Sequence, residues 1–141
     1  MVKITEYQFQ KLVVDWLDAS LPKGCFYHHS PNEGKRHVNY MVKMKNMGMK
    51  TGFPDLCLFV PTKYFWSGIP TTIFIELKRP GGKATKRQKE VHEQLREAGA
   101  IVGVIDNFAK LKLFLTNLIE VKEQQRARSL KAWQGSLDYE S

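Results

Sequence analysis

The sequence predicts an α/β fold in which a central sheet of about four strands has helices on both faces. Short apolar segments of strand length lie at 56–60, 71–77 and 101–105. Around them, apolar residues recur at helical spacing. In a chain of 141 residues this mixture favours one layered domain. We expect that domain at residues 1–121, with residues 122–141 as the polar end of the last helix or a tail.

The N-terminal segment predicts a helix followed by a strand. Apolar side chains recur at helical spacing through residues 5–19, and Thr5 followed by Gln8 matches a capping box. Glu6 lies in the first turn, where an acidic side chain usually stabilises the helix dipole at the surface. After this helix, residues 25–29 predict a short strand.

Two adjacent histidines, His28 and His29, end this strand. Neighbouring residues of a strand point to opposite faces, so we expect separate polar or phosphate contacts rather than one shared metal ion. Asn32 follows at the exit of the strand, where loop residues often carry function. Residues 37–47 then predict a second helix.

The middle of the chain predicts two buried strands joined by an aromatic loop. Gly52 lets the backbone turn tightly before the first strand, 56–60, whose continuous apolar run is typical of a strand buried on both faces. In the loop 61–70, the aromatic stretch 63–66 favours a flap over the core, with a stacking surface or a subunit contact as the alternatives. The second strand is 71–77.

The last part of the domain predicts a helix, a strand and another helix. A helix at 86–98 has Thr85 as its N-cap and Gln88 at the capping-box position. The side chains expected to face inward are Val91, Leu95 and Ala98. The strand 101–105 follows, and apolar spacing then predicts a helix from residue 108 to about residue 121.

The composition excludes several classes of protein. The N-terminus lacks the apolar core of a signal peptide, and no run approaches the roughly 20 apolar residues of a membrane span. Cys25 and Cys57 lack the spacing of a zinc site, so we expect two small buried side chains in a reducing compartment. These features predict a soluble, cytoplasmic protein.

The charge is strongly basic, with 22 Lys and Arg against 14 Asp and Glu and a formal net charge of +8. Residues 35–50 and 78–89 are two basic blocks without an acidic residue. Such a run is usually a solvated face. Because these blocks bracket two carboxylates, we favour a footprint for a phosphate backbone. The DNA-binding candidates are Lys35, Arg36, Lys43, Lys45, Lys50, Arg79, Lys83, Lys86 and Arg87.

The two carboxylates are Asp55, at the front of one predicted strand, and Glu76, near the end of the next. If these strands pair antiparallel, the carboxylates lie side by side and repel unless a divalent cation lies between them. Hard oxygen ligands in small number suit Mg²⁺ or Mn²⁺. Lys78 emerges on the same face as Glu76, where its ammonium can stabilise charge on a phosphate. The pattern therefore predicts phosphodiester hydrolysis.

The same residues carry a resemblance to a known family. Pro54-Asp55, twenty intervening residues and Glu76-Leu77-Lys78 resemble the PD-(D/E)XK nuclease signature. Gly52-Phe53-Pro54-Asp55, Ile75-Glu76-Leu77-Lys78 and Gln88 after a glycine-rich turn are similar to the motifs of the virus-type replication-repair nuclease (VRR-NUC) family. Glu6 and the stretch 30–34 also fall where that family has N-terminal motifs, so the resemblance covers residues 6–107.

The resemblance implies an αβββαβ restriction-endonuclease-like core with a Mg²⁺- or Mn²⁺-dependent site and an extra C-terminal helix. Asp55 and Glu76 would be metal ligands, joined by the backbone carbonyl of Leu77. Lys78 would be the catalytic lysine. Gln88 would point into the site rather than merely cap its helix, and Glu6 would assist at the metal or its waters.

The resemblance also implies DNA as the partner and no nucleotide cofactor. Small stand-alone members resemble Holliday-junction resolvases, which are dimers that act on branched DNA, and they are typical of phage genomes. A homodimer acting in a host cytoplasm is therefore expected. The alternatives are a restriction-type or host-DNA-degrading nuclease and a non-catalytic DNA-binding module. An HNH-type site built on the histidines is weaker, because the required spacing is absent.

Overall fold

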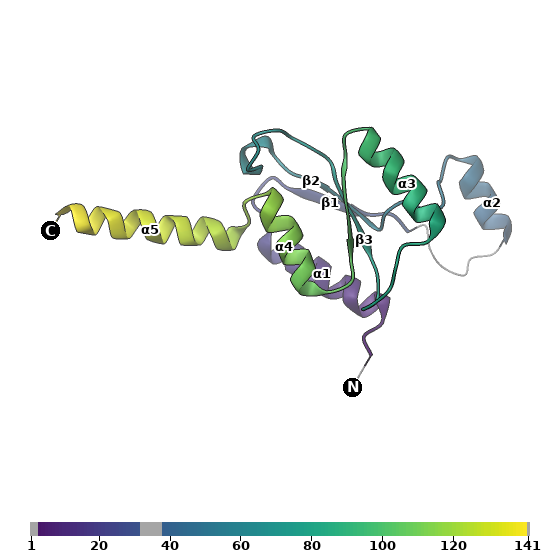
Figure 1. The fold of residues 1–141 in the computed structure, drawn as a ribbon, viewed down its shortest axis with the longest axis horizontal. Helices are drawn as coiled ribbons and strands as arrows, with labels where there is room; N and C mark the ends of the chain where they lie inside the picture. Colours follow the sequence, from purple (N-terminus) through teal and green to yellow (C-terminus); the bar gives the residue numbers. More distant parts are fainter. Residues whose placement is uncertain (1–2, 32–37, 141) are drawn as a thin grey trace.

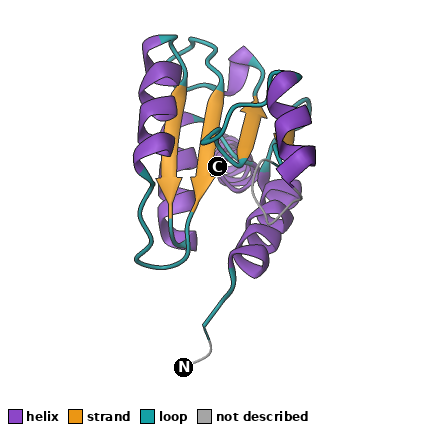
Figure 2. Cartoon of the chain, turned by 90° about the vertical axis from the view of Figure 1, so that its right-hand side faces the viewer, coloured by secondary structure: helices purple, strands orange, loops and turns teal. Residues whose placement is uncertain are grey.

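The helices and strands of the domain follow one another in the order that the sequence predicts, and they form a four-stranded mixed sheet between layers of helices (Figures 1 and 2). The computed structural model describes residues 3–31 and 38–140. Its elements are α1 (Glu6–Ser20), β1 (Phe26–His29), α2 (Val38–Asn46), β2 (Leu56–Phe59), the 3₁₀ helix η1 (Thr62–Tyr64), β3 (Ile73–Leu77), α3 (Lys86–Glu97), β4 (Ile101–Ile105), α4 (Phe108–Leu118) and α5 (Lys122–Glu140).

The strands lie in the order β1-β2-β3-β4. The first two pairs are antiparallel and β3 pairs parallel with β4. The register between β2 and β3 places Leu56 opposite Ile75. The antiparallel pairing predicted for these two strands is therefore confirmed, as is the mixed four-stranded sheet.

Each face of the sheet packs against different helices. On one face, α1 and α4 bury their apolar stripes, and Val13, Leu17, Leu111 and Leu115 are completely buried there. On the other face, α3 covers a smaller cluster of Cys57, Phe74 and Val102. Full burial of a leucine side chain contributes roughly 1.5–3 kcal/mol. The larger cluster is therefore the main source of stability, and the α3 face has room for polar groups.

Both predicted capping boxes are present. The Thr5 side chain accepts a hydrogen bond from the Gln8 backbone N–H, and the Gln8 side chain accepts one from the Thr5 backbone N–H. Thr85 and Gln88 repeat this arrangement at the start of α3. Each box satisfies backbone donors that a helix start leaves open.

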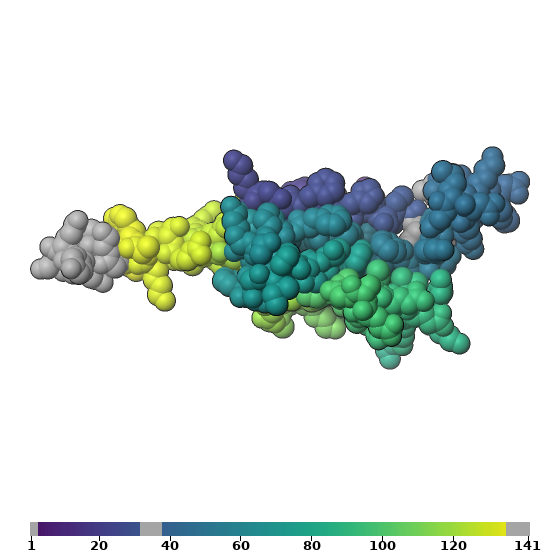
Figure 3. Space-filling model, turned by 90° about the horizontal axis from the view of Figure 1, so that it is seen from above, coloured from purple at the N-terminus to yellow at the C-terminus, as the bar shows by residue number. Residues whose placement is uncertain are grey.

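The C-terminal boundary differs from the prediction. The helix expected to reach residue 121 ends at Leu118, because Ile119 is extended and forms a bridge with the buried Phe65. The aromatic loop is thus a flap over the core, as expected. Residues 122–140 form the separate helix α5, which extends away from the sheet, opposite to α2 (Figures 1 and 3).

Three burial predictions have mixed outcomes. Phe59 of β2 is 49% exposed and packs against Phe26, so β2 is not buried on both faces along its whole length. Ala98 is exposed although it was expected to face inward. Of the two free cysteines, Cys57 is buried as expected and Cys25 is half-buried.

No helix in the described ranges has the length and apolar character needed to cross a membrane.

Candidate active site

The two predicted carboxylates lie next to each other at one end of the sheet. The last pair of the β2–β3 ladder is Leu56 with Ile75. Asp55 directly precedes Leu56 in the chain and Glu76 directly follows Ile75, so the two carboxylates extend the ladder by one position. Both are buried, with 6% and 0% of their surface exposed. The Leu77 backbone N–H donates to Asp55 Oδ2 over 2.7 Å. The Asp55 side chain therefore continues the pairing of the two strands and holds the start of β2 against the end of β3.

Glu76 accepts hydrogen bonds and charge stabilisation from neighbouring side chains. Gln88 Nε2 donates to Glu76 Oε1 over 2.9 Å, and Lys78 Nζ lies 3.7 Å from the same oxygen. A buried carboxylate is costly unless donors or opposite charge surround it. The Lys78 side chain is only 12% exposed and the Glu76 side chain only 1%, so the pair is shielded from water. The predicted grouping of Glu76 and Lys78 on one face is confirmed.

Gln88 serves both the helix and the site. Its Oε1 accepts from the Thr85 backbone N–H over 2.8 Å, while its Nε2 donates to Glu76. Gln88 therefore points into the site and does not merely cap its helix, as expected, because the two ends of one amide make the two contacts. The first turn of α3 is fixed to the end of β3 by this side chain.

His92 is a neighbour of Glu76 that the sequence analysis missed. It is 1% exposed, and its Nε2 lies 3.8 Å from Glu76 Oε2. Burial lowers the pKa of His92, and the positive charges of Arg96 and Lys78 lower it further. The imidazole is therefore neutral at neutral pH. Its spacing of four residues from Gln88, which places both on one helix face, is the signal that could have found it.

Asp55 also opens to a second set of side chains, in a cavity of about 290 Å³. Glu6 and Gln10 of α1 line this cavity together with His29 and Leu77. His29 Nδ1 lies 2.9 Å from the Asp55 carbonyl oxygen and donates to it, which is the separate polar contact expected for this histidine. The structure therefore brings Glu6 to the side of Asp55.

The metal-binding capacity of the site rests on the carboxylate pair. Within residues 3–31 and 38–140, no group of three or more His, Cys, Asp or Glu side chains is arranged to hold a metal ion. Glu6 thus shares the cavity without completing a three-ligand cluster. Mg²⁺ commonly uses one or two carboxylates and takes its other ligands from water and substrate phosphate. Two adjacent buried carboxylates fit that requirement.

The two basic blocks meet near the start of α3. Gly52, with a φ of +86°, packs on Arg87, and a Cβ at this position would lie 3.1 Å from the Arg87 carbonyl oxygen. The segment before β2, with Lys50, therefore lies against the first turn of α3. The other described candidates are exposed: Lys43, Lys45, Arg79, Lys83 and Lys86. Asn32, Lys35 and Arg36 lie outside the described residues.

Replacing Gln88 with leucine should destabilise the fold more than removing the cap alone. Q88L deletes the cap acceptor and the donor to buried Glu76, and we expect a loss of about 2–4 kcal/mol in the free energy of unfolding. Thr85→Ala, which removes only the reciprocal cap, should cost about 1 kcal/mol. Urea unfolding followed by circular dichroism measures both. Equal losses for the two variants would mean that the bond to Glu76 contributes nothing.

Comparisons with known proteins identify the family of the chain and a similar fold. The family model of the VRR-NUC domain matches residues 2–109. A solved structure of a VRR_NUC domain protein superposes with a TM-score of 0.64 at 27% sequence identity, covering 82% of this chain and 88% of the other. Among curated proteins, no match was found.

Proposed function

Because this chain belongs to the VRR-NUC domain family, whose members are nucleases of the PD-(D/E)XK type, we propose that it is a metal-dependent DNA endonuclease. One observation carries the proposal. The structure places Asp55 and Glu76 side by side and buried, with Lys78 and Gln88 on the same oxygen of Glu76. A module that only binds DNA has no need for two carboxylates close to the DNA, because they would repel its phosphates.

The residues divide the work of phosphodiester hydrolysis among them. Asp55 and Glu76, with the Leu77 carbonyl, would hold Mg²⁺ or Mn²⁺, and such an ion lowers the pKa of bound water and stabilises charge on the phosphate. The Lys78 ammonium stabilises negative charge that develops on the phosphate oxygens and orients the attacking water. Gln88 keeps the Glu76 carboxylate in one orientation through its 2.9 Å hydrogen bond.

The supporting residues have plainer roles. Glu6, which lines the cavity at Asp55, assists at the waters of the metal. Lys43, Lys45, Lys50, Arg79, Lys83, Lys86 and Arg87 hold the DNA backbone, since exposed cations contact phosphates without reading sequence.

Branched DNA is the substrate we propose, cut by a homodimer. One site cuts one strand at a time, so two copies related by a two-fold axis suit a junction with two equivalent strands. Helix α5 offers exposed Leu130 and Trp133 for such a contact, at 60% and 63% exposure. In the aromatic loop, by contrast, Phe65 is buried in its own core and Trp66 Nε1 donates to the Thr116 carbonyl oxygen.

Cleavage of defined substrates tests this function. Purified protein is incubated with a linear duplex, a flapped duplex and a four-way junction, in Mg²⁺, in Mn²⁺ and in EDTA. We expect metal-dependent cleavage, with symmetric cuts in opposite strands of the junction. Preferential cutting of the linear duplex would favour the restriction-type or DNA-degrading alternative. Binding of all three substrates without cleavage in either metal would overturn the nuclease proposal and leave the binding module.

A further inference from the structure

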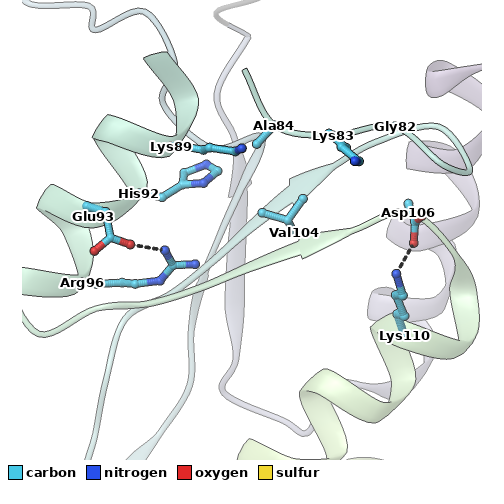
Figure 4. Close-up of a pocket in the computed structure, with 10 residues that line it drawn as sticks. All are labelled: Gly82, Lys83, Ala84, Lys89, His92, Glu93, Arg96, Val104, Asp106 and Lys110. Atoms are coloured by element: carbon cyan, nitrogen blue, oxygen red, sulfur yellow. Dashed lines mark hydrogen bonds and ion pairs between the residues drawn. The ribbon is translucent and has the colours of Figure 1, made fainter. Parts of the chain in front are cut away.

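A second cavity, of about 570 Å³, lies on the α3 face of the sheet (Figure 4). It is bounded by the loop between β3 and α3, by α3 itself, and by β4 with the start of α4. Asp55 and Glu6 do not line it, so it is distinct from the cavity beside the carboxylate pair. We name it the α3–β4 cavity. Its volume falls within the range of about 300–1,000 Å³ that small-ligand sites occupy.

Four cationic side chains line the α3–β4 cavity, and two of them are already neutralised. Arg96 pairs with Glu93 at 2.7 Å, and Lys110 pairs with Asp106 at 2.9 Å. In the described part of the chain, neither Lys83 nor Lys89 forms an ion pair. Figure 4 shows their side chains approaching the cavity from the loop and from α3, above Val104. These two ammonium groups favour an anion.

The floor of the cavity is apolar. Val104 of β4 is 36% exposed, although the sheet around it is covered by α3. Ala84 and the backbone of Gly82 extend this surface on the loop side. An apolar floor below two ammonium groups suits a ligand with an anionic group and a flat or apolar body. Among the ligands of a nuclease, a nucleotide unit has that chemistry.

The cavity adjoins the candidate active site through two residues. His92 lines it, and the same imidazole faces Glu76 at 3.8 Å. Gly82 also lines it, and a Cβ there would lie 3.3 Å from Lys78 Cβ. The α3–β4 cavity is therefore separated from Glu76 by His92 and from Lys78 by Gly82.

We propose that the α3–β4 cavity is a binding subsite for a nucleotide of the cleaved strand that flanks the scissile phosphate. Lys83 and Lys89 hold its backbone phosphate, and its sugar and base lie on Val104. This inference rests on the nuclease function proposed above and adds a specific place where the strand is held. The subsite favours an unpaired nucleotide. A base that stays stacked in a duplex cannot contact the apolar floor, whereas an unpaired base can.

A charge-pairing experiment tests the subsite without requiring cleavage. Binding of a flapped substrate is measured in EDTA for wild type, for K83A/K89A, and for the matched control K23A/K131A, whose lysines are exposed and do not line the cavity. Methylphosphonate linkages, which are neutral, replace single phosphates within four positions on either side of the flap junction. We expect K83A/K89A to lower the magnitude of the slope of log affinity against log salt by about 0.7, the value for one single-strand phosphate contact, and the control to change it little.

The methylphosphonate series gives the decisive result. In wild type, at least one neutral linkage should weaken binding several-fold, and in K83A/K89A the same linkage should weaken it no further. V104W, which fills the floor while keeping both lysines, should weaken binding and leave the salt slope unchanged. Equal effects of every neutral linkage in wild type and K83A/K89A would overturn the subsite. Tighter binding of a free 5′-deoxynucleotide monophosphate than of the strand would overturn it as well.

The two proposals fail in different ways. If wild type cleaves DNA and no linkage couples to the lysines, only the subsite is wrong. If no protein in the series cleaves, the nuclease proposal is wrong, and the binding measurements in EDTA still report on the subsite.

Discussion

Lys78→Met should lower the rate of metal-dependent DNA cleavage by about 10²–10³-fold, the usual effect of removing one group that stabilises transition-state charge. The ammonium lies 3.7 Å from Glu76 Oε1, and the Lys78 side chain is 12% exposed, so water screens its charge only weakly. Methionine keeps an unbranched apolar stem and lacks the ammonium group. Single-turnover cleavage at saturating DNA and Mn²⁺ measures the effect.

DNA binding and Mn²⁺ binding show whether a variant that loses cleavage is still folded. K78M should bind DNA in EDTA nearly as tightly as wild type, and K23M, on an exposed lysine outside the site, should cleave normally. Glu76→Gln, which keeps an acceptor for Gln88, should also lose cleavage and should lose Mn²⁺ binding in calorimetry. A K78M protein that cleaves at the wild-type rate would remove Lys78 from the mechanism.

Gly103→Val should destabilise the fold by overpacking the contact between β4 and α4, away from the site. A Cβ at Gly103 of β4 would lie 2.7–2.9 Å from three ring carbons of Phe114, which is closer than packed carbon atoms approach. Valine adds two further methyl groups against the same ring. Overpacking of this kind costs about 1–3 kcal/mol, which corresponds to a fall of roughly 3–12 °C in Tm for a domain of this size. Thermal unfolding followed by circular dichroism measures it.

A smaller partner should relieve that clash. In a double-mutant cycle, G103V combined with Phe114→Leu should be less destabilised than the sum of the two single variants by about 1 kcal/mol. Additive losses would show that the contact between Gly103 and the ring does not limit packing of α4 on the sheet.

The parts of the fold that the sequence could predict are those set by local chemistry. Thr5 with Gln8 and Thr85 with Gln88 mark helix starts because a short polar side chain must satisfy open N–H groups there. The adjacency of Asp55 and Glu76 followed from strand alternation and one assumed antiparallel pair, which the register confirms.

The parts that failed depend on tertiary packing. Apolar spacing continues to residue 121, yet Ile119 is extended, because periodicity reports which side chains are buried and not whether the backbone stays helical. Ala98 was placed inward from spacing alone, whereas the inner face of α3 centres on Gln88, Val91 and His92. The spacing of His92 from Gln88 places both on one face of α3, but the contact of His92 with Glu76 depends on how α3 packs on β3.

The two hydrogen bonds of the Gln88 amide have a consequence for local opening of the molecule. Helix ends usually fray, exchanging their first amide hydrogens with solvent much faster than the core. Here, opening the first turn of α3 breaks the bond that orients Glu76, because one side chain makes both contacts. Fraying of the first turn of α3 and loss of the fixed orientation of the Glu76 carboxylate therefore occur together. Any ligand that fixes Glu76 must, by reciprocal coupling, slow amide exchange at Thr85.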